Sequence, residues 1–275
     1  MVKARGFVDQ LLGALPLAKG ISVGDKVEED HFKGEWLRYD VKDMERSDHV
    51  LLFIHGGGFS NGTVLSRRFL CAKIASASKM DAFSLDYSQW PEYCHPQALM
   101  DAINAYQYLL KKYPAEKIHV FGESAGAHLS LTLGLYLKDH GIDLPESICV
   151  NSPVIINGPQ AFELLPSHTE RIEREPMITE DPENPTIPYF MNADAKDPYV
   201  SPYYGDFRGF SRLFVVYGSE EILHDDSTKL VELAEEAGVH VSSKEYEGLF
   251  HVFGMFDIPE TDILAADVAA FFQKR

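Results

Sequence analysis

The sequence predicts an α/β protein with a mostly parallel central sheet of about eight strands, covered by helices on both faces. Short, continuous apolar runs such as Val50–Ile54 alternate along the chain with segments of helical length and period such as Gln97–Lys112. A strand that is buried on both faces is typically such an unbroken apolar run. The 275 residues, 45% hydrophobic and 24% charged, also have an ordinary globular composition, which excludes disorder, collagen-like repeats and coiled coils.

Each strand of the predicted sheet is a short run bounded by turn residues. Two strands at the sheet edge form a predicted hairpin, Ile21–Glu29 with Glu35–Val41. The other strands are predicted at Val50–Ile54, Ala82–Tyr87, Lys117–Phe121, Ser147–Val150, Arg212–Tyr217 and Val239–Tyr246. Because helical segments separate these later strands, right-handed crossovers and parallel pairing are expected.

The predicted helices fill the intervals between the strands. They are expected at Leu65–Met80, Gln97–Lys112, Ser124–His140, Asp225–Ala237 and Thr261–Gln273. The pattern of Gln97–Lys112 repeats its apolar residues every 3.6 positions, as a helix packed on a sheet requires. Gly141 and Gly238 directly follow two of the helices, and glycine is the usual residue at a helix C-terminus.

One segment interrupts this alternation. Residues 152–210 contain nine prolines and only one short helical stretch, Gln160–Leu165. A long irregular segment inside a compact domain is usually a functional lid. We therefore predict a single domain, 1–275, in which the insertion 152–210 and the N-terminal segment 1–30 form a short cap. The cap is expected over the C-terminal edge of the sheet, where open α/β sheets bind their ligands.

Charge and cysteine content exclude several classes of function. The chain has a net charge of −17, which repels nucleic-acid phosphates, and it has no apolar run long enough to span a membrane. Three scattered cysteines, with no CxxC or HExxH pattern, predict neither a disulfide framework nor a zinc site. A cytoplasmic protein without cofactor or metal is expected, and whether it forms a homodimer is left open.

The first motif with chemical meaning is Gly122-Glu123-Ser124-Ala125-Gly126, a GxSxG pattern. It lies between the predicted strand Lys117–Phe121 and a long helix. In such a tight strand-turn-helix corner the serine hydroxyl is exposed at a helix N-terminus, and the glycines avoid steric clashes. The helix dipole favours negative charge at this position. Ser124 is therefore the candidate nucleophile.

A second motif, His55-Gly56-Gly57-Gly58-Phe59, follows the strand Val50–Ile54. Glycines leave the backbone N–H groups unshielded, so that Gly57 and Gly58 can point donors at an oxyanion. The N–H of Ala125, directly after the nucleophile, is the third candidate donor. The cluster lacks the third glycine of a dinucleotide fingerprint and the lysine of a phosphate-binding loop. His55 is interpreted as a structural anchor of the loop.

A serine hydroxyl is a weak nucleophile and needs a base within hydrogen-bonding distance. His251, in the loop after the last predicted strand, is the candidate base. In α/β folds with a GxSxG turn, the catalytic residues follow along the chain in the order serine, acid, histidine. The loop 218–226 offers the acids Glu220, Glu221, Asp225 and Asp226. Glu221 is preferred, with Glu220 and Asp225 as alternatives. The remaining acids are expected at a solvated helix N-terminus, with Asp225 or Asp226 as its cap.

Together these motifs resemble the hormone-sensitive lipase-like group of α/β-hydrolase carboxylesterases. HGGGF at 55–59 and GESAG at 122–126 are similar to the HGGG and GDSAG signatures of that group, and residues 87–92 stand where it has a Tyr-Arg-Leu-Ala-Pro-Glu turn. Alignment to the group's Asp-Pro-Leu-x-Asp-Glu loop places Glu221 at the position of the triad acid. The chain departs from the group at Glu123, where aspartate is usual, and in lacking the Asp-Pro-Leu sequence itself.

The resemblance implies the α/β-hydrolase fold and a serine hydrolase that cleaves carboxylic esters through an acyl-enzyme, with a small-molecule ester as its partner. Short acyl chains are expected, because the insertion carries bulky aromatic residues that could close a pocket: Phe162, Tyr189, Phe190, Tyr199, Tyr203 and Tyr204. Three related activities stay open, those of an arylformamidase-like amidase, a lactonase and a carbohydrate deacetylase. A non-catalytic small-molecule receptor on the same fold is a further alternative.

Overall fold

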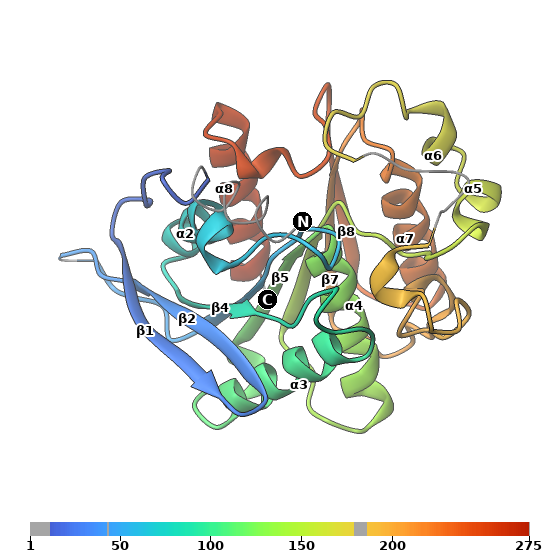
Figure 1. Ribbon diagram of the computed structural model, residues 1–275. Helices are drawn as coiled ribbons and strands as arrows, with labels where there is room; N and C mark the ends of the chain where they lie inside the picture. Colours follow the sequence, from blue (N-terminus) through green and yellow to red (C-terminus); the bar gives the residue numbers. More distant parts are fainter. Residues whose placement is uncertain (1–11, 43, 179–185, 275) are drawn as a thin grey trace.

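Eight strands form one sheet in the computed structural model, which describes residues 12–42, 44–178 and 186–274 (Figure 1). The strand order across the sheet is β1-β2-β4-β3-β5-β6-β7-β8. The strands are β1 Ile21–Glu29, β2 Phe32–Tyr39, β3 Val50–Ile54, β4 Asp81–Asp86, β5 Ile118–Glu123, β6 Ser147–Asn151, β7 Arg212–Gly218 and β8 Val241–Tyr246.

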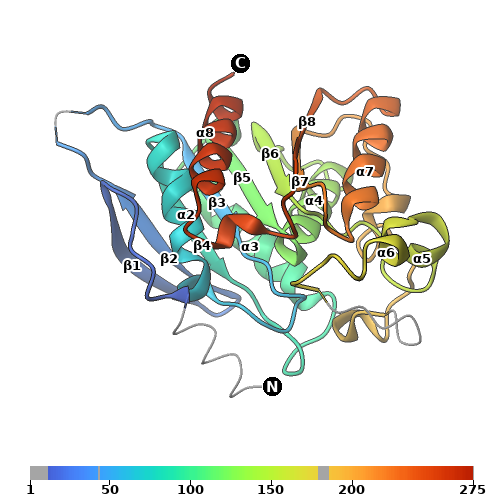
Figure 2. The ribbon, with the colours of Figure 1, turned by 90° about the horizontal axis from the view of Figure 1, so that it is seen from above.

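The predicted α/β class with a mostly parallel sheet is confirmed. Strands β3 to β8 pair in parallel, while β1–β2 and β2–β4 pair antiparallel at one edge, where Figure 2 shows the two long strands extending beyond the helices. Strand β2 begins at Phe32, earlier than the predicted Glu35. The two residues after Phe32 are a lysine and a glycine, so the apolar pattern did not predict this start of the strand. Gly34 is nevertheless required by packing, because a Cβ there would clash with Phe83 and the backbone of Ser84.

Helices cover both faces of the sheet. Helices α2 (Val64–Ser78) and α8 (Pro259–Gln273) lie together on one face, and α3 (Gln97–Leu110), α4 (Ala125–Asp139) and α7 (His224–Glu236) lie on the other (Figure 1). Strand β3 divides its side chains between the two faces, because alternate residues of a strand point in opposite directions. Its residues Val50, Leu52 and Ile54 join the core under α3 and α4, whereas Leu51 and Phe53 join the core under α2 and α8.

The insertion 152–210 contains only short helices within its described residues. In its described part these are α5 (Gln160–Leu164), α6 (Ser167–Glu170) and the 3-10 turns η2 (Pro188–Phe190) and η3 (Pro202–Tyr204). Two further 3-10 turns lie elsewhere, η1 (Ala115–Lys117) and η4 (Phe253–Met255). Helices α5 and α6 lie beside α7 in both views of the ribbon (Figures 1 and 2).

The division into a domain with a cap stays a prediction. Residues 1–11 of the predicted N-terminal cap segment lie outside the described residues, and residues 21–29 of it form β1. The described helices include none that is long and apolar enough to cross a membrane. The three cysteines are free thiols, and the cytoplasmic location stays a prediction.

Candidate active site

Ser124 lies in a strained turn between β5 and α4. Its φ angle is +52°, a region that costs a residue with a side chain roughly 1–3 kcal/mol and that clusters at functional sites. Ser124 is the N-cap of α4, and its own N–H donates to the carbonyl of Asn151 (2.8 Å). The turn thus places the hydroxyl at the positive end of a helix dipole, with 8% of the residue exposed.

The glycines on either side of the serine are required by packing. A Cβ on Gly122 would clash with the carbonyl of Gly126 and with the side chain of Ser130, and a Cβ on Gly126 would clash with the carbonyls of Ile54 and His55. The second clash involves the end of β3 and the start of the HGGGF loop. Glycine at 126 therefore allows this loop to approach the turn that carries Ser124.

The structure brings three predicted residues into one hydrogen-bonded chain. The Oγ of Ser124 lies 2.9 Å from Nε2 of His251, and Nδ1 of His251 lies 2.9 Å from Oε2 of Glu221. His251 is 3% exposed, and Glu221 is fully buried. A carboxylate beside Nδ1 fixes the proton on that nitrogen, which leaves Nε2 free to accept the serine proton.

Of the acids in loop 218–226, Glu221 is the one that reaches His251. Its second oxygen, Oε1, accepts the N–H of Gly218 (3.1 Å), so both carboxylate oxygens are held. Glu220 contacts Arg174 at 3.5 Å, at the surface. Asp225 accepts the N–H of Ser167 (2.9 Å).

Asp225 and Asp226 lie in the first turn of α7, as expected, but the expectation that one of them caps the helix is wrong, and Asp226 is not solvated. Leu223, not Asp225 or Asp226, is the N-cap of α7. Asp226 is fully buried, with Oδ2 2.6 Å from Nε2 of the buried His168. Its other oxygen accepts the N–H of Ile155 (2.8 Å). A buried carboxylate needs such partners, and they come from the insertion, so Asp226 connects the insertion to α7.

The HGGGF loop is fixed by His55, as the sequence indicated. The ring is fully buried and stacks on Tyr87 with ring centres 4.3 Å apart. Its Nδ1 contacts the carbonyl of Gly56 (2.8 Å), and the hydroxyl of Tyr87 donates to the carbonyl of His55 (2.9 Å). Burial lowers the pKa of His55 to about 3, so the ring is neutral and Nδ1–H donates.

Two glycines of this loop have positive φ angles. Gly57 has φ +127° and Gly58 has φ +60°, angles that favour glycine. Within the part of the chain that the structure describes, the N–H groups of Gly57 and Gly58 have no backbone acceptor. Ala125 is the first residue of α4, and the first N–H groups of a helix have no acceptor within it.

Sequence reasoning missed two residues that support the site, Arg67 and Glu175. Glu123 is fully buried, and its Oε1 accepts both the N–H of Gly56 (3.1 Å) and the Nε–H of Arg67. Glu175, in the insertion, accepts the N–H of His251 (3.3 Å). Neither Arg67 nor Glu175 lies in a motif, so no local signal was available for either.

A cavity of about 590 Å³ opens in front of Ser124 and His251. Its described wall combines the HGGGF loop, parts of the insertion within 154–178 and 186–188, and the start of the loop after His251. Of the six aromatic residues proposed to close a pocket, Phe162 lines this cavity. Tyr189 and Phe190 instead pack against Phe59 in the core, with ring centres 4.7 and 5.0 Å from it.

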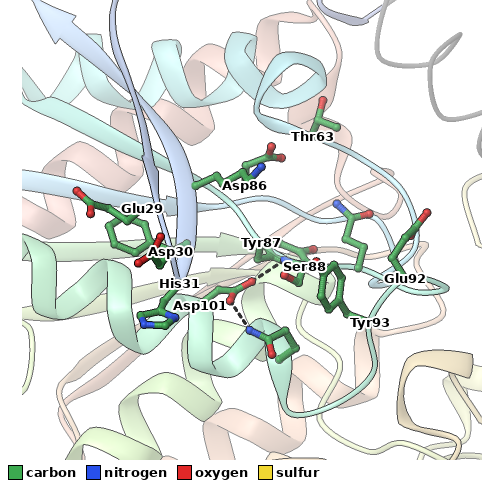
Figure 3. A pocket seen from close by; sticks show the side chains of 14 residues that line it. Glu29, Asp30, His31, Thr63, Asp86, Tyr87, Ser88, Glu92, Tyr93 and Asp101 are labelled. Atoms are coloured by element: carbon green, nitrogen blue, oxygen red, sulfur yellow. Dashed lines mark hydrogen bonds between the residues drawn. The ribbon is translucent and has the colours of Figure 1, made fainter.

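A second cavity of about 600 Å³ lies beside the β1–β2 hairpin and contains neither Ser124 nor His251. Figure 3 shows its acidic wall, with Asp101 bonded to Ser88 and to Gln97. Its carboxylates are Glu29, Asp30, Asp86, Glu92 and Asp101. The described residues include no group of three or more potential ligands arranged to hold a metal ion.

Comparison with known proteins agrees with this architecture. A family of proteins with the alpha/beta hydrolase fold matches residues 51–255. An acetyl-hydrolase of Streptomyces hygroscopicus is 34% identical over 236 residues, which cover 85% of this chain and 76% of the relative. An esterase of Acinetobacter venetianus is 32% identical over 239 residues, covering 84% and 77%.

Solved structures give the same result. The crystal structure of an esterase from the bacterial hormone-sensitive lipase family superposes with a TM-score of 0.89 at 27% identity, covering 98% of this chain and 89% of the other. The chain therefore belongs to the α/β-hydrolase family, and within it to the hormone-sensitive lipase-like group that its motifs resemble. It is an enzyme of the hydrolase class.

Proposed function

We propose that this enzyme cleaves carboxylic esters with short acyl chains through a covalent intermediate on Ser124. The observation that carries the proposal is the chain of two 2.9 Å contacts from Ser124 Oγ through His251 to Glu221. A serine, a base within reach and a third group that orients the base are the parts that nucleophilic catalysis by a hydroxyl requires. The names of the two relatives, acetyl-hydrolase and esterase, support the same reaction.

The proposed reaction begins when Ser124 Oγ attacks the ester carbonyl and its proton passes to Nε2 of His251. The resulting imidazolium is stabilised by the Glu221 carboxylate at Nδ1. As the tetrahedral intermediate collapses, the bond to the alcohol oxygen breaks and His251 gives that oxygen its proton. Water, deprotonated by the same imidazole, then attacks the acyl-serine, and the carboxylic acid leaves with Ser124 restored.

The negative oxygen of the tetrahedral intermediate is assigned to the N–H groups of Gly57, Gly58 and Ala125. Their lack of backbone acceptors supports this role, because donors already committed elsewhere could not turn to an oxyanion. A donor of this type is worth about 2.7–4 kcal/mol in comparable sites. The position of Ala125 at the start of α4 adds the helix dipole to its effect.

The test of the mechanism is the Ser124→Ala variant with 4-nitrophenyl butyrate as substrate. Without the hydroxyl the acyl-enzyme bond of the first step cannot form. The rate of hydrolysis should therefore fall to what the oxyanion donors and substrate binding supply, at most about 10³–10⁴-fold above the uncatalysed rate in water. A fluorophosphonate should label wild-type protein at Ser124 and leave the variant unlabelled. Circular dichroism controls for folding, and wild-type turnover by a folded alanine variant would contradict the proposal.

The preference for short acyl chains is tested separately. Phe162 and the neighbouring insertion residues limit the cavity to about 590 Å³, a volume in the range of ordinary small-ligand sites. We expect kcat/KM to be higher for acetyl to hexanoyl esters than for longer ones. A series of 4-nitrophenyl esters from two to sixteen carbons measures this, and a maximum at sixteen carbons would refute it while leaving the mechanism intact.

A further inference from the structure

Arg67, on helix α2, has an incomplete set of partners at a buried position. The residue is 7% exposed. Its Nε donates to Glu123, but the terminal nitrogen Nη1 is buried without a hydrogen-bond partner. A guanidinium has five N–H donors, and leaving a buried donor unmatched costs about 1–3 kcal/mol. Arg67 also lines the active-site cavity.

The next residue in the chain shows what a fully matched arginine looks like here. Arg68 donates from Nε and Nη2 to the two oxygens of the buried Glu35, both at 2.8 Å. This two-bond arrangement is the usual one for arginine and carboxylate. Glu123 instead uses a single oxygen, which it shares with the N–H of Gly56. Oε2 of Glu123 and the terminal nitrogen Nη1 of Arg67 are both buried without a hydrogen-bond partner, so that Nη1 is left for another acceptor.

The described wall of the cavity has no carboxylate that would repel a negative ligand at this position. Among the described residues that line it, Arg67 is the one with a formal charge when histidines are neutral, and none is a carboxylate. This holds in a chain with a net charge of −17. The acids nearest the site, Glu123, Glu175 and Glu221, bind Arg67 or His251 and do not line the cavity.

We propose that Arg67 determines specificity by binding a carboxylate group of the substrate, so that the natural ester is a carboxylate-bearing one, such as a half-ester of a dicarboxylic acid. The inference rests on the proposed function. Substrate carboxylate, Arg67 and Glu123 would then alternate in charge, and the planar guanidinium would bind both substrate oxygens at once, which lysine cannot do. The ester carbonyl would meanwhile lie at Ser124, beside the same loop.

The test compares matched esters that differ in the carboxylate. For the acyl side, the 4-nitrophenyl half-ester of adipic acid is compared with 4-nitrophenyl hexanoate. For the alcohol side, 4-acetoxybenzoate is compared with its methyl ester. The measured quantity is the ratio of kcat/KM for the charged ester to that for the neutral one, at an ionic strength near 0.15 M, where long-range charge effects are screened.

Arg67→Gln should lower this ratio roughly tenfold to a hundredfold in one of the two pairs, the range expected for hydrogen bonds to a charged group. Arg68→Gln is the matched control, because it makes the same change in net charge and also leaves a buried carboxylate unpaired. It should leave both ratios at the wild-type value. The double variant Arg67→Gln/Glu123→Gln leaves no unpaired charge at this buried position. It should show the same lowered ratio, and it replaces Arg67→Gln in the test if that single variant folds poorly.

Equal ratios in wild type, Arg67→Gln and the double variant would overturn the inference, and Ser124-dependent hydrolysis of the neutral esters would show that the proposed function still holds. A purely structural role for Arg67 would lower kcat/KM for both members of a pair alike. If no ester is hydrolysed in a Ser124-dependent way, the proposed function fails. Calorimetric binding of adipate to wild type, Arg67→Gln and Arg68→Gln then tests the carboxylate site by itself, since weaker binding in Arg67→Gln alone supports it and equal binding contradicts it.

Discussion

The two cavities of this protein have nearly the same volume, about 590 and 600 Å³, and opposite chemistry. The active-site cavity presents a strained serine, a histidine and one arginine, with no carboxylate on its described wall. The acidic cavity presents five carboxylates, all labelled in Figure 3, and one lysine, Lys33. Volume therefore does not mark the reactive site. What distinguishes it is a set of groups held in a reactive geometry at the expense of local strain.

Two buried carboxylates, one near each cavity, differ in what they bind. Glu221 and Asp101 are both buried, and each accepts two hydrogen bonds. The partners of Asp101 are the N–H of Ser88 and the amide of Gln97, so this acid fixes a loop to the start of α3. One partner of Glu221 is His251, so this acid acts on a group that can exchange protons.

The largest expected effect comes from replacing these two acids in parallel. Glu221→Gln should lower kcat by about 10⁴-fold, because the imidazole loses its fixed tautomer and the stabilisation of its charged form. Asp101→Asn should instead lower the free energy of unfolding by about 1–3 kcal/mol with turnover largely retained. Nitrophenyl ester kinetics and urea denaturation measure the two quantities. A large loss of turnover in folded Asp101→Asn would contradict its purely structural role. Wild-type turnover in Glu220→Gln and Asp225→Asn would support Glu221 as the acid that acts on His251.

The next effect concerns the loop of the active-site cavity. A Cβ on Gly57 would clash with the carbonyl of Asn61, whereas the nearest atom to a Cβ on Gly58 is Ser60 Oγ at 3.9 Å. Gly57→Ala should therefore displace the N–H donors and lower kcat by about 10²–10³-fold. Gly58→Ala carries mainly a backbone cost of about 1–2 kcal/mol and should lose less turnover. Equal losses in the two variants would count against the assigned donors.

A third effect is a pH dependence of stability that originates at His55, between the two cavities. His55 stacks on Tyr87, which lines the acidic cavity, and precedes Gly56, which lines the active-site cavity. Burial lowers the pKa of His55 from 6.5 to about 3. Between these values the unfolded chain binds a proton that the folded chain does not, so stability falls as the pH falls, by up to about 1.4 kcal/mol per pH unit.

Urea denaturation at several pH values from 4 to 7 checks this contribution. His55→Phe keeps an aromatic ring against Tyr87 and should make the pH slope shallower. Tyr87→Phe removes the hydroxyl bonded to the His55 carbonyl, and should lower stability by about 0.5–1.5 kcal/mol at every pH without changing the slope. An unchanged slope in His55→Phe would show that folding does not lower the pKa of this histidine.

Local sequence patterns determined the sheet, the helices and the two glycine motifs. Apolar runs and 3.6-residue stripes report burial within a few residues, and such burial is what forms an element. Gly122 also acts locally, because a Cβ there would clash with Gly126 and Ser130, next to the turn that strains Ser124. For this reason the strand and helix ranges agree closely with the structure, and the chemistry of the turn could be inferred before its neighbours were known.

Contacts between distant segments were decided by the tertiary structure alone. Ser124 and His251 are 127 residues apart, His168 and Asp226 are 58 apart, and Arg67 and Glu123 are 56 apart. The predicted chain order indicated the first pair, but nothing in the sequence placed the insertion over Asp226 or turned Arg67 toward Glu123. These contacts exist because parallel crossovers bring the ends of several strands to one edge, where buried charges must find partners wherever the packed chain supplies them.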